Sequence, residues 1–95
     1  MAHLLFTPPG KAQVRLHLVK DVFVIGRSPD CDLPLDDTVS SRRHCQLRAW
    51  AGSHLLEDLS SKNGTFVNGE RITSRQLADG DLISVGDRQV VYKAR

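Results

Sequence analysis

Three short polar segments carry the side chains of this sequence that could do chemistry. They are Gly26-Arg27, the run Ser41-Arg42-Arg43-His44, and residues 58–69. Together they supply guanidinium groups, hydroxyls and amides, and each segment is flanked by apolar runs typical of β-strands. Guanidinium forks and hydroxyl donors suit a phosphate dianion. We therefore interpret the segments as loops of a β-scaffold that could together bind a phosphorylated peptide.

The same residues suit catalysis poorly. Ser41, His44 and Asp58 contain the residue types of a catalytic triad, but no Gly-x-Ser-x-Gly turn is present. A serine and a histidine three positions apart in a loop rarely come within hydrogen-bonding reach. The histidines and cysteines do not have the spacing of metal ligands. The sequence therefore predicts a protein that is not an enzyme, with no metal and no cofactor.

Length and charge restrict the protein to a few classes. The 95 residues fit a single domain over residues 1–95, either free-standing or one module of a longer protein. The net charge of +2 is too small for the concentrated basic face of a general nucleic-acid binder. No apolar run approaches the roughly 18 residues of a membrane span, and no secretory signal is visible. Cys31 and Cys45 are expected to be reduced thiols of a cytoplasmic protein, with a disulfide as the alternative.

Short apolar runs separated by turn signals repeat along the chain, which predicts strands. The expected strands are residues 3–6, 14–18, 22–25, 33–35, 45–50, 54–58, 65–67, 70–72, 82–85 and 89–92. Pro34 restricts its short run to a sheet edge, and Asn68-Gly69 between two strand runs predicts a hairpin. No stretch has a 3.6-residue period over a helical length. About ten short strands with frequent turns predict an all-β sandwich or barrel.

Each polar feature has an ordinary structural explanation when it is taken alone. Gly26 lets the chain bend at the end of a buried strand, and Arg27 could be a solvated arginine. His44 precedes an alternating strand, so we expect a buried, hydrogen-bonded residue and not a catalyst. Asn63 and Gly64 tolerate positive φ and could form a simple turn. The Asn63 amide could also bond the backbone of an extended ligand.

Taken together, the order and spacing of these segments resemble the forkhead-associated (FHA) domain, a phosphothreonine-peptide-binding family. The resemblance rests on Gly26-Arg27, Ser41-x-x-His44, Asp58-Leu59-x-Ser61-x-Asn63-Gly64-Thr65-x-Val67-Asn68-Gly69, and Asp79-Gly80-Asp81 followed by Ile83 and Gly86. It extends from about Val14 to Val91, which is nearly the whole chain.

The resemblance implies an eleven-stranded β-sandwich with its binding loops gathered at one end. Arg27 and Ser41 would hold the phosphate, and Arg42 would add a further contact. Asn63 would bond the peptide backbone near the phosphothreonine, and Asn68 would reach a more distant part of that backbone. The residues that would shape the loops are Gly26, His44, Ser61 and Gly64.

Two positions depart from the family pattern. Lys62 stands where the family often has a threonine that contributes to the phosphate pocket. It could supply charge in place of the hydroxyl or point to solvent, and it is counted here among the predicted binding residues. Ser40 stands where an apolar residue is common, which leaves the path of its loop open.

The leading hypothesis is a phosphothreonine-dependent protein–protein interaction module. Its partner would be a phosphothreonine-containing protein or peptide, either a Ser/Thr kinase or a substrate of one. The alternative is a phosphate-independent scaffold on the same sandwich, which Lys62 and Ser40 keep open. A β-fold that binds single-stranded nucleic acid would need exposed aromatic residues on a basic groove. Most of the five aromatic residues are expected in the core, so no nucleic-acid partner is predicted. The lack of a membrane-spanning run likewise predicts no membrane partner.

Overall fold

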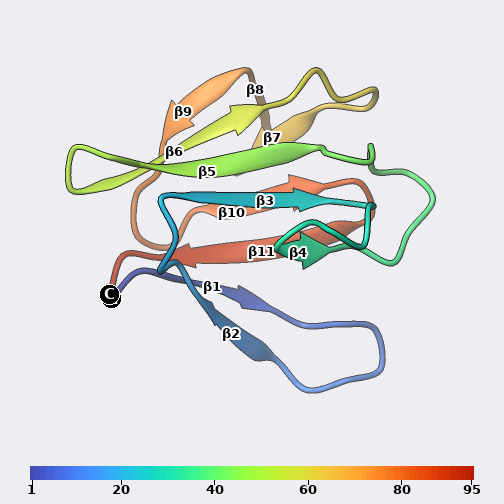
Figure 1. Ribbon diagram of the computed structural model, residues 1–95, viewed down its shortest axis with the longest axis horizontal. Helices are drawn as coiled ribbons and strands as arrows, with labels where there is room; N and C mark the ends of the chain where they lie inside the picture. The colour runs from blue at the N-terminus through green and yellow to red at the C-terminus, as the bar shows by residue number, and fades with distance from the viewer.

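The computed structural model describes residues 1–95 as two β-sheets stacked face to face (Figure 1). The strands are β1 (His3–Phe6), β2 (Val14–His17), β3 (Val22–Gly26), β4 (Leu33–Pro34), β5 (Cys45–Trp50), β6 (Ser53–Asp58), β7 (Thr65–Val67), β8 (Glu70–Ile72), β9 (Ser74–Gln76), β10 (Leu82–Val85) and β11 (Arg88–Lys93). The first sheet has the order β2-β1-β11-β10-β7-β8, and the second has the order β4-β3-β5-β6-β9. The structure contains no helix long and apolar enough to cross a membrane. The predicted all-β sandwich of eleven strands is confirmed.

The core forms where the inward-facing side chains of the two sheets meet, because alternate residues of a strand point to opposite faces. Leu47 of β5 lies opposite Leu56 of β6, and both are fully buried. From the first sheet, Ile83 and Tyr92 are buried against them in one cluster of 16 residues. The Tyr92 hydroxyl lies 2.9 Å from Nδ1 of the buried His54. This bond satisfies a polar group that would otherwise be stranded in the core.

Two strands differ from the expectation. β9 was not predicted, because it contains no apolar side chain whose spacing could indicate a strand. It forms by antiparallel pairing with β6, where Arg75 lies opposite Leu56. β2 was predicted as a half-buried alternating strand, but of its four residues only Leu16 is even partly buried. β2 forms one edge of the first sheet, where fewer neighbours cover its side chains. β4 is an edge strand of the second sheet, as Pro34 predicted.

The connections that carry the predicted binding residues meet at one end of the sandwich, on the right in Figure 1. These are the β3–β4, β4–β5 and β6–β7 loops, and the short β10–β11 turn reaches the same end. Both ends of the chain lie on the left, where β1 begins and β11 finishes. The sandwich thus holds these loops together at one end, and loops positioned by a stable scaffold often carry function.

Candidate functional site

The β4–β5 loop lies directly against the end of β3. The backbone N–H of Arg27 donates to the carbonyl oxygen of Ser41 at 2.9 Å, and that of Ser28 donates to the Arg42 oxygen at 3.0 Å. This close approach requires Gly26, because a Cβ atom there would come within 2.2 Å of the Arg42 carbonyl oxygen. The loop-shaping role predicted for Gly26 therefore has a steric reason in the structure.

Two arginines at this end of the sandwich form no ion pair with a carboxylate of the protein. Nε of Arg27 donates to the carbonyl oxygen of Ser40 at 3.2 Å, which orients the exposed guanidinium. The two terminal nitrogens of that group remain available as donors. Arg42 is also exposed, and no acidic oxygen lies within 4 Å of either side chain. Arg43 differs, because its guanidinium lies 3.8 Å from the carboxylate of Asp30.

The β4–β5 and β6–β7 loops are joined by bonds between the predicted binding residues. The hydroxyl oxygen of Ser41 accepts the backbone N–H of Lys62 at 3.0 Å, so its own hydrogen remains free to donate. The side-chain amide of Asn63 donates to the carbonyl oxygen of Val39 at 2.8 Å, which leaves its own oxygen and a second N–H free. Lys62 and Asn63 are both exposed. The structure thus brings five of the six predicted binding residues to one surface.

His44 connects the same two loops from beneath. It is fully buried. Its Nδ1 accepts the backbone N–H of Ser41 at 3.0 Å, so Nε2 carries the hydrogen and donates to the carbonyl oxygen of Gly64 at 2.7 Å. Both ring nitrogens are therefore occupied by backbone groups. Because His44 bonds the backbone of Ser41 and not its hydroxyl, the pair is not arranged as a nucleophile and its base.

Two matching Asp-x-x-Ser turns hold the two binding loops, and sequence reasoning did not assign a role to either aspartate. Asp37 accepts the backbone N–H of Ser40 at 3.0 Å and also its hydroxyl. Asp58 accepts the backbone N–H of Ser61 at 3.1 Å, together with the hydroxyls of Ser61 and Thr65. The signal was the repeated spacing, because a side chain that accepts from a residue three positions later closes a turn.

The charges of these two aspartates are stabilised by the turns they close. Burial alone would raise the pKa of Asp58, but bonds from Ser61 and Thr65 outweigh it and hold the pKa below its ordinary 3.8. The pKa of Asp37 is likewise lowered, since bonds from Ser40 and the Asp87 backbone outweigh its burial. Both carboxylates are therefore charged near neutral pH.

Ser40 and Ser61 are fixed in these turns. Ser40, whose polarity left the loop path open, is buried, and Asp37 accepts from its backbone N–H and from its hydroxyl. The loop is therefore anchored at this position. Ser61 is buried too, and its hydroxyl oxygen accepts the backbone N–H of Gly64 at 3.0 Å. That bond shapes the turn at which Gly64 takes a φ of 91°.

Asn68 is not brought to the other predicted binding residues. It follows β7, whereas Gly64 precedes that strand, so β7 separates the two positions. The Asn68 amide donates to Asp81 at 3.0 Å, and its oxygen accepts the backbone N–H of Leu82 at 2.9 Å. With a φ of 52°, it forms the β7–β8 hairpin turn and ties that turn to β10. These contacts give Asn68 a structural role in the β7–β8 turn.

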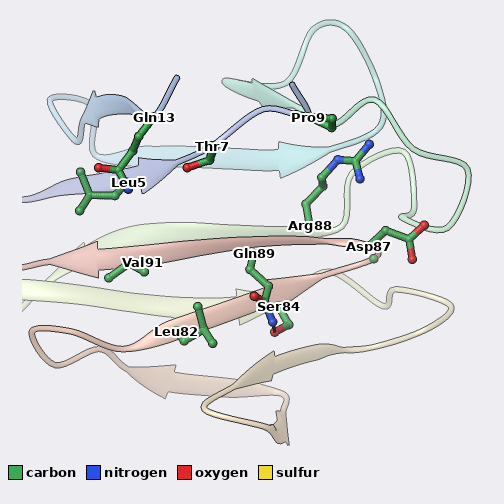
Figure 2. A pocket seen from close by; sticks show the side chains of 11 residues that line it. Leu5, Thr7, Pro9, Gln13, Leu82, Ser84, Asp87, Arg88, Gln89 and Val91 are labelled. Carbon is green, nitrogen blue, oxygen red and sulfur yellow. Dashed lines mark hydrogen bonds between the residues drawn. The ribbon is translucent and has the colours of Figure 1, made fainter. Parts of the chain in front are cut away.

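The marked hollows of the surface lie away from the five gathered residues. Figure 2 shows the hollow on the outer face of the first sheet, where Leu5, Val91 and Leu82 lie across three neighbouring strands. None of the gathered residues lines this hollow or the other two. No three His, Cys, Asp or Glu side chains are grouped to hold a metal ion. The loop end therefore presents its donors on an open surface.

Comparison with known proteins identifies the scaffold. The FHA domain family matches residues 23–86. Glycogen accumulation regulator GarA of Mycolicibacterium smegmatis is 43% identical over 67 residues, which are 70% of this chain and 42% of GarA. The FHA domain-containing protein FhaA of Mycobacterium tuberculosis is 45% identical over 71 residues, which are 74% of this chain and 13% of FhaA. The chain thus spans less than half of either relative.

Solved structures agree with this assignment. One, from a structural and functional analysis of phosphothreonine-dependent FHA domain interactions, superposes with a TM-score of 0.83 at 35% identity and covers 97% of this chain and 94% of its own. The FhaA FHA domain complexed with the intracellular domain of Rv3910 gives 0.86 at 34% identity and covers 98% and 100%. Because the family match includes both β3 and the loops that follow it, this chain belongs to the FHA domain family.

Proposed function

We propose that this chain is a phosphothreonine-dependent protein–protein interaction module. The observation that carries the proposal is that backbone bonds hold the segments of Arg27, Ser41 and Arg42 together at the loop end, where neither arginine forms an ion pair. A phosphate dianion offers several acceptor oxygens, and charge-assisted bonds to it are the strong kind. The likeness to an FHA domain studied for phosphothreonine-dependent interactions supports the same ligand.

Each residue of the surface has a distinct part in this proposal. The terminal nitrogens of Arg27 and the Ser41 hydroxyl bind phosphate oxygens, and Arg42 adds a further contact. Asn63 uses its free amide groups on the peptide backbone, and Lys62 adds positive charge beside them. The partner is a protein phosphorylated on threonine by a Ser/Thr kinase, or the kinase itself. The occupied ring nitrogens of His44 support binding without catalysis.

We further propose that residues 1–95 act as one domain in the cytoplasm, alone or as a module of a longer protein. Support comes from Cys31 and Cys45, which are both buried as free thiols. Burial raises the pKa of the Cys45 thiol to about 12, which keeps it protonated and unreactive. Unpaired thiols are usual in a reducing compartment.

The test is a titration of matched peptides by calorimetry, after a degenerate phosphothreonine library has supplied a binding sequence. We expect the phosphorylated peptide to bind and the plain peptide to bind far more weakly. Arg27→Ala should cost about 2–5 kcal/mol of binding free energy if the charge pair is desolvated. It should leave the melting temperature nearly unchanged, because an exposed side chain supports no core. Arg15→Ala, which removes an exposed arginine from β2, is the matched control.

Equal affinity for the phosphorylated and plain peptides would contradict the proposal and favour the phosphate-independent scaffold. An Arg27→Ala variant that binds normally would place the phosphate elsewhere. If the variant unfolds, Arg27 is a structural residue. Arg27→Lys then keeps the positive charge but removes the bidentate guanidinium, so it tests which of the two the binding needs.

A further inference from the structure

Arg71 of β8 packs against the turn that carries Asn63. A Cβ atom added to Gly64 would lie 2.7 Å from Nε and 3.0 Å from Cζ of Arg71, so the guanidinium touches the backbone there. In the β7–β8 hairpin, Arg71 lies opposite Phe66, one residue pair beyond the pairing of Thr65 with Ile72. Since the guanidinium contacts Gly64, which precedes β7, the Arg71 side chain extends past Phe66 toward the binding loops. Neither the family resemblance nor the predicted site includes this residue.

The guanidinium of Arg71 has no acidic partner in the protein. The neighbouring carboxylate of Glu70 pairs with Arg75 at 3.2 Å, and Asp58, where the β6–β7 loop begins, accepts from Ser61 and Thr65. No acidic oxygen lies within 4 Å of Arg71, although Lys20, Arg43, Arg48, Arg75 and Lys93 all have such partners. Arg71 is exposed, contacts the backbone of the Gly64 turn and has no counter-ion. Its guanidinium is therefore partly ordered and its N–H donors are free to bind a ligand.

The position of Arg71 separates it from the phosphate-binding donors. Arg27 reaches the β4–β5 loop through the carbonyl of Ser40, on the β3 side of that loop. Arg71 contacts the β6–β7 loop at Gly64, directly after Asn63. A peptide whose backbone is held by Asn63 would carry a neighbouring side chain toward β8. A planar fork is well matched to a carboxylate, which it can bind in a bidentate manner.

We propose that Arg71 is a specificity-determining residue that binds an acidic side chain of the peptide close to the phosphothreonine. The module would then select partners with Asp or Glu beside the phosphorylated residue, on the side nearest Asn63. This inference rests on the proposed function. The competing explanation is that Arg71 only covers Gly64 and stabilises its turn.

The experiment compares phosphothreonine peptides that differ by a single Asp or Asn at each of the flanking positions. Affinities are measured by fluorescence anisotropy at low and at moderate salt. For the unmodified protein we expect Asp at one position to bind roughly threefold to tenfold more tightly than Asn, with the gap narrowing as salt screens it. Arg71→Gln should remove this preference while binding of the Asn peptide and the melting temperature stay the same. Arg71→Lys should retain part of the preference.

Arg15→Gln is the matched control, because it removes the same charge at β2, the opposite edge of the same sheet. It should leave the preference intact. The inference is overturned if no position prefers Asp, or if Arg71→Gln keeps the preference. It is also overturned if Arg71→Gln weakens both peptides equally and lowers the melting temperature, since Arg71 then only supports Gly64. Failure of the proposed function would give a different result, because phosphorylated and plain peptides would then bind the unmodified protein equally.

Discussion

His44 illustrates how a residue that need not touch a ligand can determine a binding surface. Its ring bonds the backbone of Ser41 on one loop and of Gly64 on the other. A buried imidazole with both nitrogens used in this way fixes the distance between the loops. In the proposed function, this alignment of the Ser41 and Asn63 donors before the ligand arrives would lower the entropic cost of binding.

We expect His44→Ala to lower the free energy of unfolding by about 1–3 kcal/mol, because two buried backbone groups lose their partner. Peptide binding should weaken as well, since the loops are no longer tied. Chemical denaturation and peptide titration measure the two effects, with the exposed His17→Ala as control. An unchanged stability with abolished binding would instead place His44 in contact with the ligand.

Lys62 bears on the choice between phosphothreonine and phosphoserine. The two residues differ by one methyl, which in a well-fitted pocket is worth about 1–3 kcal/mol, and the β-branch also stiffens χ1. We expect tighter binding of the phosphothreonine peptide, measured at fixed salt on otherwise identical peptides. Lys62→Gln should weaken both peptides by a similar factor, because its charge acts on the phosphate. Equal affinities would show that the protein offers no pocket for the methyl.

At the scale of the strands, the sequence predicts most elements because apolar alternation and turn residues are local signals. Ten of the eleven strands overlap the predicted runs, and the exception is β9. That strand has the sequence Ser-Arg-Gln, so nothing local distinguishes it from a loop, and only its pairing with β6 creates it. The limited burial of β2 has the same origin, because position at a sheet edge is a property of the whole sheet.

The residues of the binding loops could also be predicted only in part. Motif spacing pointed to residues that the fold places in adjoining loops, including Arg27 and Ser41. It assigned Asn68 to a ligand contact and did not reveal its internal bonds, because the same Asn-Gly pair that forms a hairpin turn could also present an amide to a ligand. The bonds of Asn68 to Asp81 and Leu82 join residues far apart in sequence, and only the folded chain reveals them.

Gly26→Ala tests how closely β3 and the β4–β5 loop must approach. The added methyl would meet the Arg42 carbonyl oxygen at 2.2 Å, so the loop must move. We expect a loss of about 1–3 kcal/mol in stability from overpacking, together with a clear loss of phosphopeptide binding. Melting temperatures and peptide affinities are the measurements.

Gly52→Ala supplies the comparison for this substitution. Gly52 has a φ of 76° and open space around it, so the substitution strains the backbone without a steric clash. It lies in the β5–β6 turn, away from the binding loops. We expect reduced stability with normal binding. If Gly26→Ala also retained normal binding, the close approach at β3 would not be needed for the site.

For the molecule as a whole, the two sheets separate stability from recognition. The buried cluster of 16 residues lies between the sheets, while the exposed donors occupy one end. Both chain ends emerge at the other end of the sandwich (Figure 1). A tag fused to either terminus would therefore begin away from the binding loops.

The stability of the sandwich should depend on pH near neutrality through His54. Burial lowers the pKa of His54 below its ordinary 6.5, so the unfolded chain binds a proton more readily than the folded one. The contribution of neutral His54 is therefore fully present above pH 6.5 and is lost as the pH falls below that value. Urea unfolding between about pH 8 and 5 should show this loss, and His54→Gln should reduce the slope. An identical slope in the variant would assign the dependence to another histidine.

At lower pH the turns closed by Asp37 and Asp58 should fail, and the loops with them. Because both pKa values are lowered from 3.8 in the folded state, these carboxylates stabilise the protein above pH 3.8. That stabilisation is lost as the pH falls below 3.8 through the folded-state values. Asp58→Asn should cost about 1–3 kcal/mol at neutral pH, since an amide cannot accept all of these bonds. The difference from the unmodified protein should shrink as the acid range is entered, because protonation removes the same interaction from both. A gap that stayed constant down to the acid transition would mean that the charge of Asp58 contributes nothing and that only its shape matters.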